Sequence, residues 1–161
     1  MVLTIRPAEI HDATTATALL NAIIRTGGTT ALQTEMSPPE VTNLFLCSDY
    51  VACCQVADWD GALIGFQSVG RNPKMPENWG DMASFAAEGA TGKGLGTALF
   101  QATLVAARAQ GLTHLNATIR ADNTSGLTYY SRMGFADYAI DAAVPLADGT
   151  PVDRVKKQLT L

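Results

Sequence analysis

Residues 81–100 read DMASFAAEGATGKGLGTALF, and the rest of the chain is organised around them. Its first part alternates as a strand does, with Met82, Ser84 and Ala86 on one face. Glycines then stand at positions 89, 92, 94 and 96, and they are followed by apolar residues at helical spacing: Leu95, Leu99, Ala102, Ala106 and Ala109. A strand, a glycine loop and a helix start can bind phosphate, because glycines let backbone N–H groups approach an anion that the helix dipole favours.

Three kinds of phosphate loop must be distinguished. A Walker A loop has four residues between its first Gly and its Gly-Lys pair, and here the glycine before Gly92-Lys93 lies too close. A dinucleotide fingerprint reads G-x-G-x-x-G with an acid about 20 positions later, and neither feature is present. The remaining pattern resembles the pyrophosphate loop of the GNAT acyltransferases, Gln/Arg-x-x-Gly-x-Gly/Ala, with Gly94 and Gly96 as its glycines. Thr91 replaces the Gln or Arg, so an ordinary glycine-rich turn stays open on this motif alone.

Length and composition indicate one globular domain, residues 1–161. Hydrophobic residues make up 47% of the chain, which argues against disorder. The net charge is −4 and no basic cluster exceeds Lys156-Lys157, so we expect no nucleic-acid partner. The N-terminus lacks the apolar core of a signal peptide, and no apolar run is long enough to span a membrane. We therefore expect a cytoplasmic protein without a membrane partner.

The cysteines and histidines lack the spacing of a metal site, so no metal is expected. Cys47, Cys53 and Cys54 form no C-x-x-C pair and are interpreted as buried, reduced thiols. His11 and His114 show no ligand spacing either.

The remaining segments predict an α/β domain with a mixed sheet. Further strands are expected over residues 2–6, 50–57, 62–69, 115–120, 135–140 and 152–159. Helices are expected over 12–25 and 123–134, with a short one from residue 37. Asp12 is the predicted cap of the first helix. The strand near Trp79, the glycine-loop helix and the next strand form a β–α–β crossover, which is expected to be right-handed.

A second motif follows at residues 123–135, which read NTSGLTYYSRMGF. It resembles the C-terminal GNAT signature N-x-x-[S/A]…Y-x-x-x-G-F, with Asn123 and Tyr130 in place. Either Ser125 stands one position early or Gly126 fills the small site. The two motifs in this order make the chain similar to GNAT acetyltransferases from about residue 3 to 159. The resemblance implies a single-domain GNAT fold, whose mixed, mostly antiparallel central sheet is flanked by helices, and acetyl-CoA as co-substrate for acetylation of a small-molecule amine.

A narrower resemblance concerns the strand before the loop. Phosphinothricin-type acetyltransferases carry Glu-x-Ser/Thr-[VI]-Tyr-Val there, and Asp81 falls at that Glu with Phe85 at the Tyr. This resemblance implies an amino acid or an amino-acid analogue as acceptor. A zwitterionic amino acid needs a cation for its carboxylate, and we expect the loop residues Arg71, Asn72 and Lys74 to bind it.

Other functions stay open at this point. The acceptor could be a polyamine, for which Glu35 and Glu77 are the nearest acids in the sequence, or a protein N-terminus. A GNAT-fold module could bind acyl-CoA without turnover, and a nucleotide-binding P-loop protein is the most distant alternative. A homodimer is compatible with the sequence.

Acyl transfer from a thioester to an amine needs a deprotonated amine and a protonated leaving thiol. Asp81 is the candidate base, acting directly or through water, and a structural carboxylate at a strand edge is an equal alternative. Glu88 is a second candidate, although a solvated charge is the better interpretation of it. Tyr130 resembles the family's general acid, and its alternative is a tyrosine packed in the core.

The resemblance also implies a coenzyme site. Backbone N–H groups are expected to hold the pyrophosphate along the loop residues Thr91, Gly92, Lys93, Gly94, Leu95, Gly96 and Thr97. The main chain of Phe85, Ala86 and Ala87 is expected to pair with the pantetheine arm as if the coenzyme added a strand. Asn123 resembles an asparagine that contacts pantetheine, and helix capping is a compatible second role.

Overall fold

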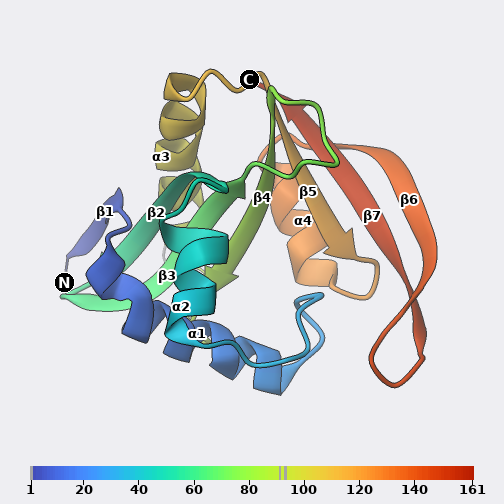
Figure 1. The fold of residues 1–161 in the computed structure, drawn as a ribbon, viewed down its shortest axis with the longest axis horizontal. Coiled ribbons are helices and arrows are strands. Elements are labelled where there is room, and N and C mark those ends of the chain that lie inside the picture. Colours follow the sequence, from blue (N-terminus) through green and yellow to red (C-terminus); the bar gives the residue numbers. More distant parts are fainter. Residues whose placement is uncertain (1, 91, 93) are drawn as a thin grey trace.

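In the part of the chain that the structure describes, seven strands form one open sheet in the order β1-β2-β3-β4-β5-β7-β6 (Figure 1). The computed structural model describes residues 2–90, 92 and 94–161. Only β4 and β5 are parallel among the described neighbours, and the other pairs are antiparallel. The strands are β1 (Leu3–Pro7), β2 (Val51–Trp59), β3 (Ala62–Gly70), β4 (Trp79–Ala86), β5 (His114–Arg120), β6 (Ala136–Pro145) and β7 (Pro151–Thr160). The mixed, mostly antiparallel sheet predicted from the sequence is confirmed.

Helices lie on both faces of this sheet. They are α1 (Ala13–Thr26), α2 (Pro38–Val41), α3 (Leu95–Ala109) and α4 (Thr124–Arg132), with a 3-10 turn at Ile10–Asp12 and a π turn at Thr42–Leu46. α1 and α2 bury apolar side chains against the face that carries Phe66 and Phe85. α3 and α4 pack on the opposite face, against Met82 and Leu115. None of the described helices is both long and apolar enough to cross a membrane.

β4 and β5 are paired only at their beginning. Their register ends at Met82↔Ala117, although β4 continues to Ala86 and β5 to Arg120. Beyond that point β4 stays paired with β3, and β5 stays paired with β7. The two strands therefore separate into a V-shaped gap within the sheet (Figure 1).

The start of α1 differs from the prediction in one respect. Asp12 precedes α1 as expected, but its side chain does not cap the helix. It accepts two hydrogen bonds from the Arg6 guanidinium, at 2.8 and 2.9 Å, and one from the backbone N–H of Glu9. Arg6 also donates to Asp58 on β2 at 2.9 Å. The pair with Arg6 joins two charged groups through two parallel hydrogen bonds, which a cap to the helix backbone would not provide, so the carboxylate turns toward β1.

Asp12→Asn should lower the free energy of unfolding by about 2 kcal/mol near neutral pH, because Arg6 loses a buried charged partner. The hydrogen bonds from Arg6 hold the pKa of Asp12 below its usual range in the folded protein. Its contribution is therefore complete above the unfolded pKa and is lost as the pH falls through the folded pKa. Urea unfolding of both proteins from about pH 7 to pH 3 should show the difference shrinking in acid. A difference that is constant over this range would contradict the ionic origin of the stabilisation.

Candidate functional site

The gap beside β4 leaves one edge of its backbone without a strand partner. Ala87 donates its backbone N–H to Ile64 on the β3 side at 2.8 Å. Antiparallel strands exchange hydrogen bonds at every second pair, so Phe85 also turns its N–H and C=O toward β3. Ser84 and Ala86 consequently turn theirs toward the gap, in the half of β4 that β5 has left. An extended ligand with amide groups could bind there as an added strand.

The glycine loop lies at the N-terminus of α3. Gly92 and Gly94 have φ values of 84° and 73°, and a Cβ at either position would meet no atom within 4 Å. Ala98 donates to the Gly94 carbonyl, so the N–H groups of residues 95–97 have no partner inside the helix. Open space, unpaired N–H groups and the helix dipole together favour an anion at this point.

The second glycine of the motif, Gly96, has a different role. A Cβ there would lie 2.7 Å from the ring of Tyr129 on α4, and the Tyr129 hydroxyl donates to the Gly96 carbonyl at 2.8 Å. Gly96 is therefore required where α4 packs against α3. Thr91 and Lys93, which were predicted for the same loop, lie outside the described residues.

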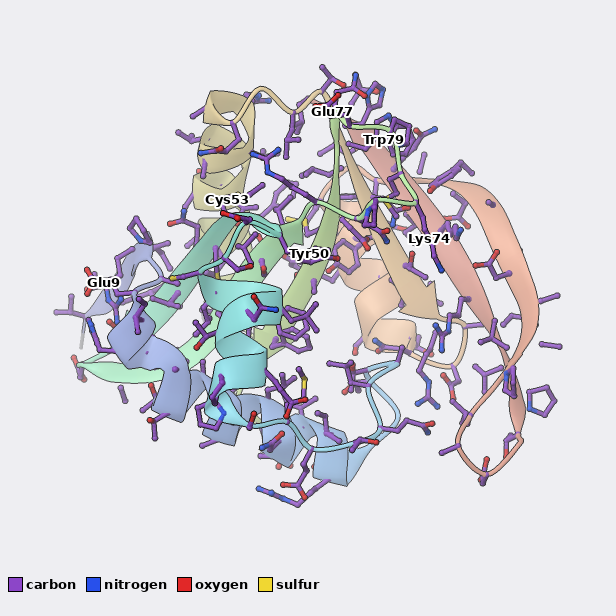
Figure 2. The ribbon with its side chains drawn as sticks, viewed as in Figure 1. Glu9, Tyr50, Cys53, Lys74, Glu77 and Trp79 are labelled. Carbon is purple, nitrogen blue, oxygen red and sulfur yellow. The ribbon has the colours of Figure 1, made fainter. Side chains whose placement is uncertain are left out.

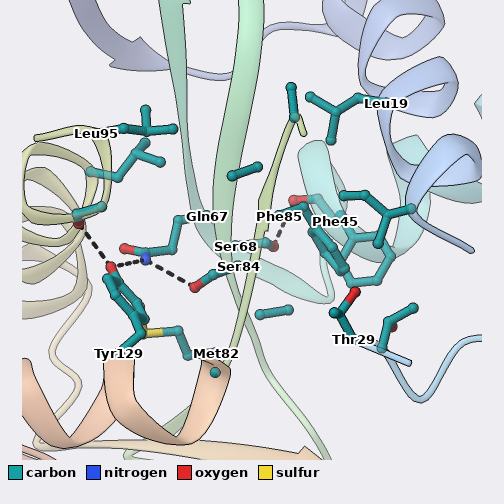
Figure 3. Close-up of a pocket in the computed structure, with 18 of the residues that line it drawn as sticks. Leu19, Thr29, Phe45, Gln67, Ser68, Met82, Ser84, Phe85, Leu95 and Tyr129 are labelled. Carbon is teal, nitrogen blue, oxygen red and sulfur yellow. Dashed lines mark hydrogen bonds between the residues drawn. The ribbon is translucent and has the colours of Figure 1, made fainter. Parts of the chain in front are cut away.

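A cavity of about 1750 Å³ passes through the gap (Figure 3). The glycine loop and Tyr129 line it on the α3 side, and Leu19, Phe45 and Tyr50 line it on the α1 side. Aromatic packing forms part of the α1 side, where the rings of Phe45 and Phe85 lie 5.2 Å apart. The cavity joins the two faces of the sheet, so two molecules could meet inside it from opposite directions.

Asp81 lines this cavity, with both of its carboxylate oxygens held by amides. Asn116 on β5 donates to Oδ1 at 3.0 Å, and Asn72 donates to Oδ2 at 3.2 Å. Asn116 is fully buried, and its carbonyl oxygen accepts a hydrogen bond from the Tyr138 hydroxyl on β6. The pKa of Tyr50, which lies close to Asp81, is raised mainly by burial and further by the charge of Asp81. The carboxylate is thus fixed in orientation near the closed end of the gap.

Tyr130 lines the same cavity from α4. Its hydroxyl lies 2.8 Å from Ser84 Oγ, and its ring packs against Phe135 with centroids 5.2 Å apart. Burial raises the pKa of Tyr130 above its usual value, and the hydrogen bond with Ser84 partly opposes the shift. The phenol therefore carries its proton at neutral pH. A core position and an acid at the cavity are both compatible with this geometry.

The three predicted acceptor-binding residues separate in the structure. Arg71 donates to Gln110 beyond the end of α3 at 3.0 Å and is not among the described residues that line the cavity. Lys74 is exposed, on the loop before β4, and its backbone N–H donates to Asn72 (Figure 2). Asn72 is the member of the three that reaches the site, through its bond to Asp81.

Arg120, at the end of β5, is a cavity-lining cation that the sequence did not reveal. It is 9% exposed, and it donates to both carboxylate oxygens of Asp122 at 2.9 and 2.8 Å and to the Thr30 carbonyl at 3.2 Å. No local pattern marks this arginine, because its place in the cavity depends on β5 having parted from β4. The same holds for Asn116, which donates to Asp81, and for Tyr138, which donates to Asn116.

Asn123 caps α4 and also holds the loop that follows α1. Its Oδ1 accepts the backbone N–H of Gly126 at 3.1 Å, and its Nδ2 donates to the Thr29 carbonyl at 3.1 Å. A Cβ at Gly126 would lie 2.5 Å from the Asn123 amide. This contact supports Gly126, rather than Ser125, as the small residue of the second motif.

The remaining charged candidates do not form a second site. Glu88 is exposed at the loop end of β4, as expected of a solvated charge. His11 pairs with Glu9 at 2.9 Å, and the ring of His114 stacks on Trp79 with centroids 4.8 Å apart. Among the described residues, no group of three or more His, Cys, Asp or Glu could hold a metal ion.

Comparison with known proteins assigns the family. Residues 20–135 match the model of the acetyltransferase (GNAT) family. The chain belongs to this family. A mycothiol acetyltransferase of Gordonia bronchialis is 42% identical over 60 residues, which are 37% of this chain. The chain spans 20% of the length of that relative.

Solved structures of GNAT enzymes share the whole fold. A phosphinothricin acetyltransferase of Sinorhizobium meliloti in complex with acetyl-CoA is 23% identical with a TM-score of 0.83, and the match covers 100% of this chain and 89% of that one. A ribosomal-protein-alanine N-acetyltransferase of Brucella melitensis is 22% identical with a TM-score of 0.85, over 98% and 99% of the two chains. Proteins named for such different acceptors match equally well, so this likeness shows the fold and does not select an acceptor.

Gly96→Ala should destabilise the protein by about 1–3 kcal/mol, because the added methyl overpacks against Tyr129. The sign of the change in the free energy of unfolding is the test, because replacing glycine by alanine inside an exposed helix normally stabilises a protein by about 1 kcal/mol. Urea unfolding of the variant and the parent measures the change. A gain in stability would contradict the close contact between α3 and α4.

Proposed function

We propose that this GNAT protein transfers the acetyl group of acetyl-CoA to the amine of a small molecule, an amino acid or a close analogue. The observation that carries the proposal is the gap between β4 and β5, which has a free backbone edge, an anion site at one end and Asp81 and Tyr130 on its walls. Acetyl-CoA is the co-substrate of the family, and the structure of the Sinorhizobium relative holds it. A cytoplasmic location and a homodimer stay predictions from the sequence.

The coenzyme would lie along β4 with its pyrophosphate at the glycine loop. The N–H groups of residues 94–97 would bind the pyrophosphate, together with the predicted contribution of residues 91–93. The amide groups of pantetheine would pair with the backbone of Ser84 and Ala86, which faces the gap. The neighbours Phe85 and Ala87 were also predicted for this role, but their N–H groups are directed to β3.

The reaction would need one base and one acid. The amine nitrogen attacks the thioester carbonyl, so that a C–N bond forms and the C–S bond breaks. Asp81, directly or through one water, would accept the proton that the amine loses. Tyr130 would donate its proton to the departing sulfur, which the protonated state of the buried phenol supports.

Arg120, a buried cation of the cavity, supports an acceptor that carries a carboxylate and would take the role that was first given to Arg71. A polyamine would instead be favoured by several carboxylates around the amine. Of the acidic lining residues, Asp12 and Asp58 are paired with Arg6, which leaves Asp81 and Glu88. Glu35 pairs with Arg25 at 2.5 Å and Glu77 is exposed, and neither is among the described lining residues.

Gly94→Glu should weaken acetyl-CoA binding about 100-fold or more, because a negative side chain would stand where the pyrophosphate binds. Calorimetry with acetyl-CoA measures the affinity, and Gly149→Glu is the control. Gly149 also has a positive φ and open space around it, but it lies in the turn between β6 and β7. Equal affinity in the two variants would overturn the loop assignment.

Asp81→Asn should lower kcat about 100-fold with amino-acid acceptors and leave the Kd for acetyl-CoA unchanged, because only the base is lost. Thiol release with amino acids, methionine sulfoximine, phosphinothricin, polyamines and aminoglycosides measures turnover. Glu88→Gln should keep the turnover of the wild type. If turnover is instead lost in Glu88→Gln and kept in Asp81→Asn, the role of base belongs to Glu88. Acetyl-CoA binding by the wild type without turnover on any acceptor would favour a non-catalytic module.

A further inference from the structure

Hydrogen bonds of Gln67 link Ser84 on β4 to Tyr129 on α4 beside the cavity (Figure 3). Ser84 also contacts the hydroxyl of Tyr130, so four polar side chains form one hydrogen-bonded chain. We propose that Ser84, oriented by Gln67, is a positioning residue that directs the proton of Tyr130 toward the leaving sulfur. This inference rests on the proposed role of Tyr130 as the acid, and it adds the groups that orient the Tyr130 proton.

The direction of the chain is fixed at Tyr129. Its hydroxyl is 2.8 Å from the Gly96 carbonyl oxygen, and a carbonyl can only accept, so the single Tyr129 proton is used there. The Tyr129 oxygen must then accept from Gln67, whose amide nitrogen lies 3.0 Å away. This contact determines which end of the Gln67 carboxamide is the nitrogen.

The same nitrogen orients Ser84. Gln67 Nε2 donates to Ser84 Oγ at 2.9 Å and occupies one of the two lone pairs of this oxygen. Either hydroxyl could donate across the 2.8 Å between Ser84 and Tyr130. Ser84 is assigned as the donor, because the Tyr130 oxygen is its other hydrogen-bond partner among the described residues. When Tyr130 accepts this bond, its own proton is free to point into the cavity.

Burial limits the contact of Gln67 and Tyr130 with water. Gln67 is 1% exposed and Tyr130 is 7% exposed. The Gln67 carbonyl oxygen has no hydrogen-bond partner among the described residues, so the two bonds of the amide nitrogen determine how this side chain is turned. The phosphinothricin-type motif has Val or Ile where this chain has Ser84, so the hydroxyl is a departure from that pattern.

The proton transfer balances within this chain of groups. As the C–S bond of the thioester breaks, the O–H bond of Tyr130 breaks and an S–H bond forms. The negative charge moves from the sulfur to the Tyr130 oxygen, where the Ser84 hydroxyl donates to it. A hydrogen bond to a charged oxygen is stronger than one between neutral groups, so Ser84 stabilises the phenolate until solvent returns a proton to it after the thiol has left. Ser84 and Gln67 keep their own protons.

A double-mutant cycle tests the inference. Ser84→Ala should slow acetyl transfer in a single turnover about tenfold, because a bond to a charged group is lost, while the Kd for acetyl-CoA stays the same. In a Tyr130→Phe background the same substitution should have no further effect, since there is no phenolate to stabilise. Ser84→Thr, which keeps the hydroxyl, should restore most of the rate.

Ser68 supplies the matched control. It is a buried serine on β3, and its hydroxyl donates to the Phe45 carbonyl at 2.7 Å on the other face of the sheet. Any loss of rate from Ser68→Ala should therefore persist unchanged in the Tyr130→Phe background. Urea unfolding of each variant identifies losses that come from stability alone.

The outcomes separate this inference from the proposed function. If Tyr130→Phe slows transfer but the loss from Ser84→Ala is additive or absent, Ser84 does not position Tyr130, and the acid assignment stands. If Tyr130→Phe transfers as fast as the wild type, the acid assignment and the role of Ser84 are both overturned. If the wild type binds acetyl-CoA and transfers to no amine, the proposed function fails and the inference fails with it.

Discussion

The parting of β4 from β5 is the constraint on which the rest of the site depends. A backbone N–H or C=O that is buried without a partner costs about 1–3 kcal/mol, and the edge of β4 at Ser84 and Ala86 has no strand beside it. Such an edge must be met by water or by a ligand with its own donors and acceptors. The fold therefore leaves backbone groups that need hydrogen-bond partners from a ligand or from water. This requirement is independent of the side chains.

The side chains around the gap are arranged on two faces with different chemistry. On the α1 side, amides fix Asp81, and Tyr50 lies close to it. On the α4 side, Tyr130 contacts the Ser84 hydroxyl, which the Gln67 carboxamide holds in turn. Strand alternation produces this separation, because Asp81 and Ser84 are an odd number of residues apart on β4 and so point to opposite faces. The proposed base Asp81 and Ser84, the hydrogen-bond partner of the proposed acid Tyr130, are thus close in sequence and still face different parts of the cavity.

The fold could be predicted because its signals are local. The alternation in β4, the glycines before α3 and the capping Asn123 each lie within a few residues of the element that they define. The cap assigned to Asp12 was wrong because its true partner, Arg6, lies on another element.

The site was harder to predict because its contacts join distant segments. Gly96 was expected to face the coenzyme, and its need for glycine comes from Tyr129, which lies 33 residues later. Arg120 and Asn116 have no pattern of their own, and their roles appear only when β5 is placed beside the gap. The signal that could have pointed to Ser84 was its departure from the Val or Ile of the related motif.

A cavity that opens on both faces of the sheet affects the order in which substrates bind and react. The donor and the acceptor can occupy it together, so the acetyl group can pass between them in one step and no side chain has to carry it. The thiols agree with this scheme. Burial raises the pKa of Cys53 to about 11 and raises that of Cys54 further, so both are poor nucleophiles at neutral pH, and neither lines the cavity. The proposed reaction would then pass through a ternary complex, in which both reactants are bound before either product departs.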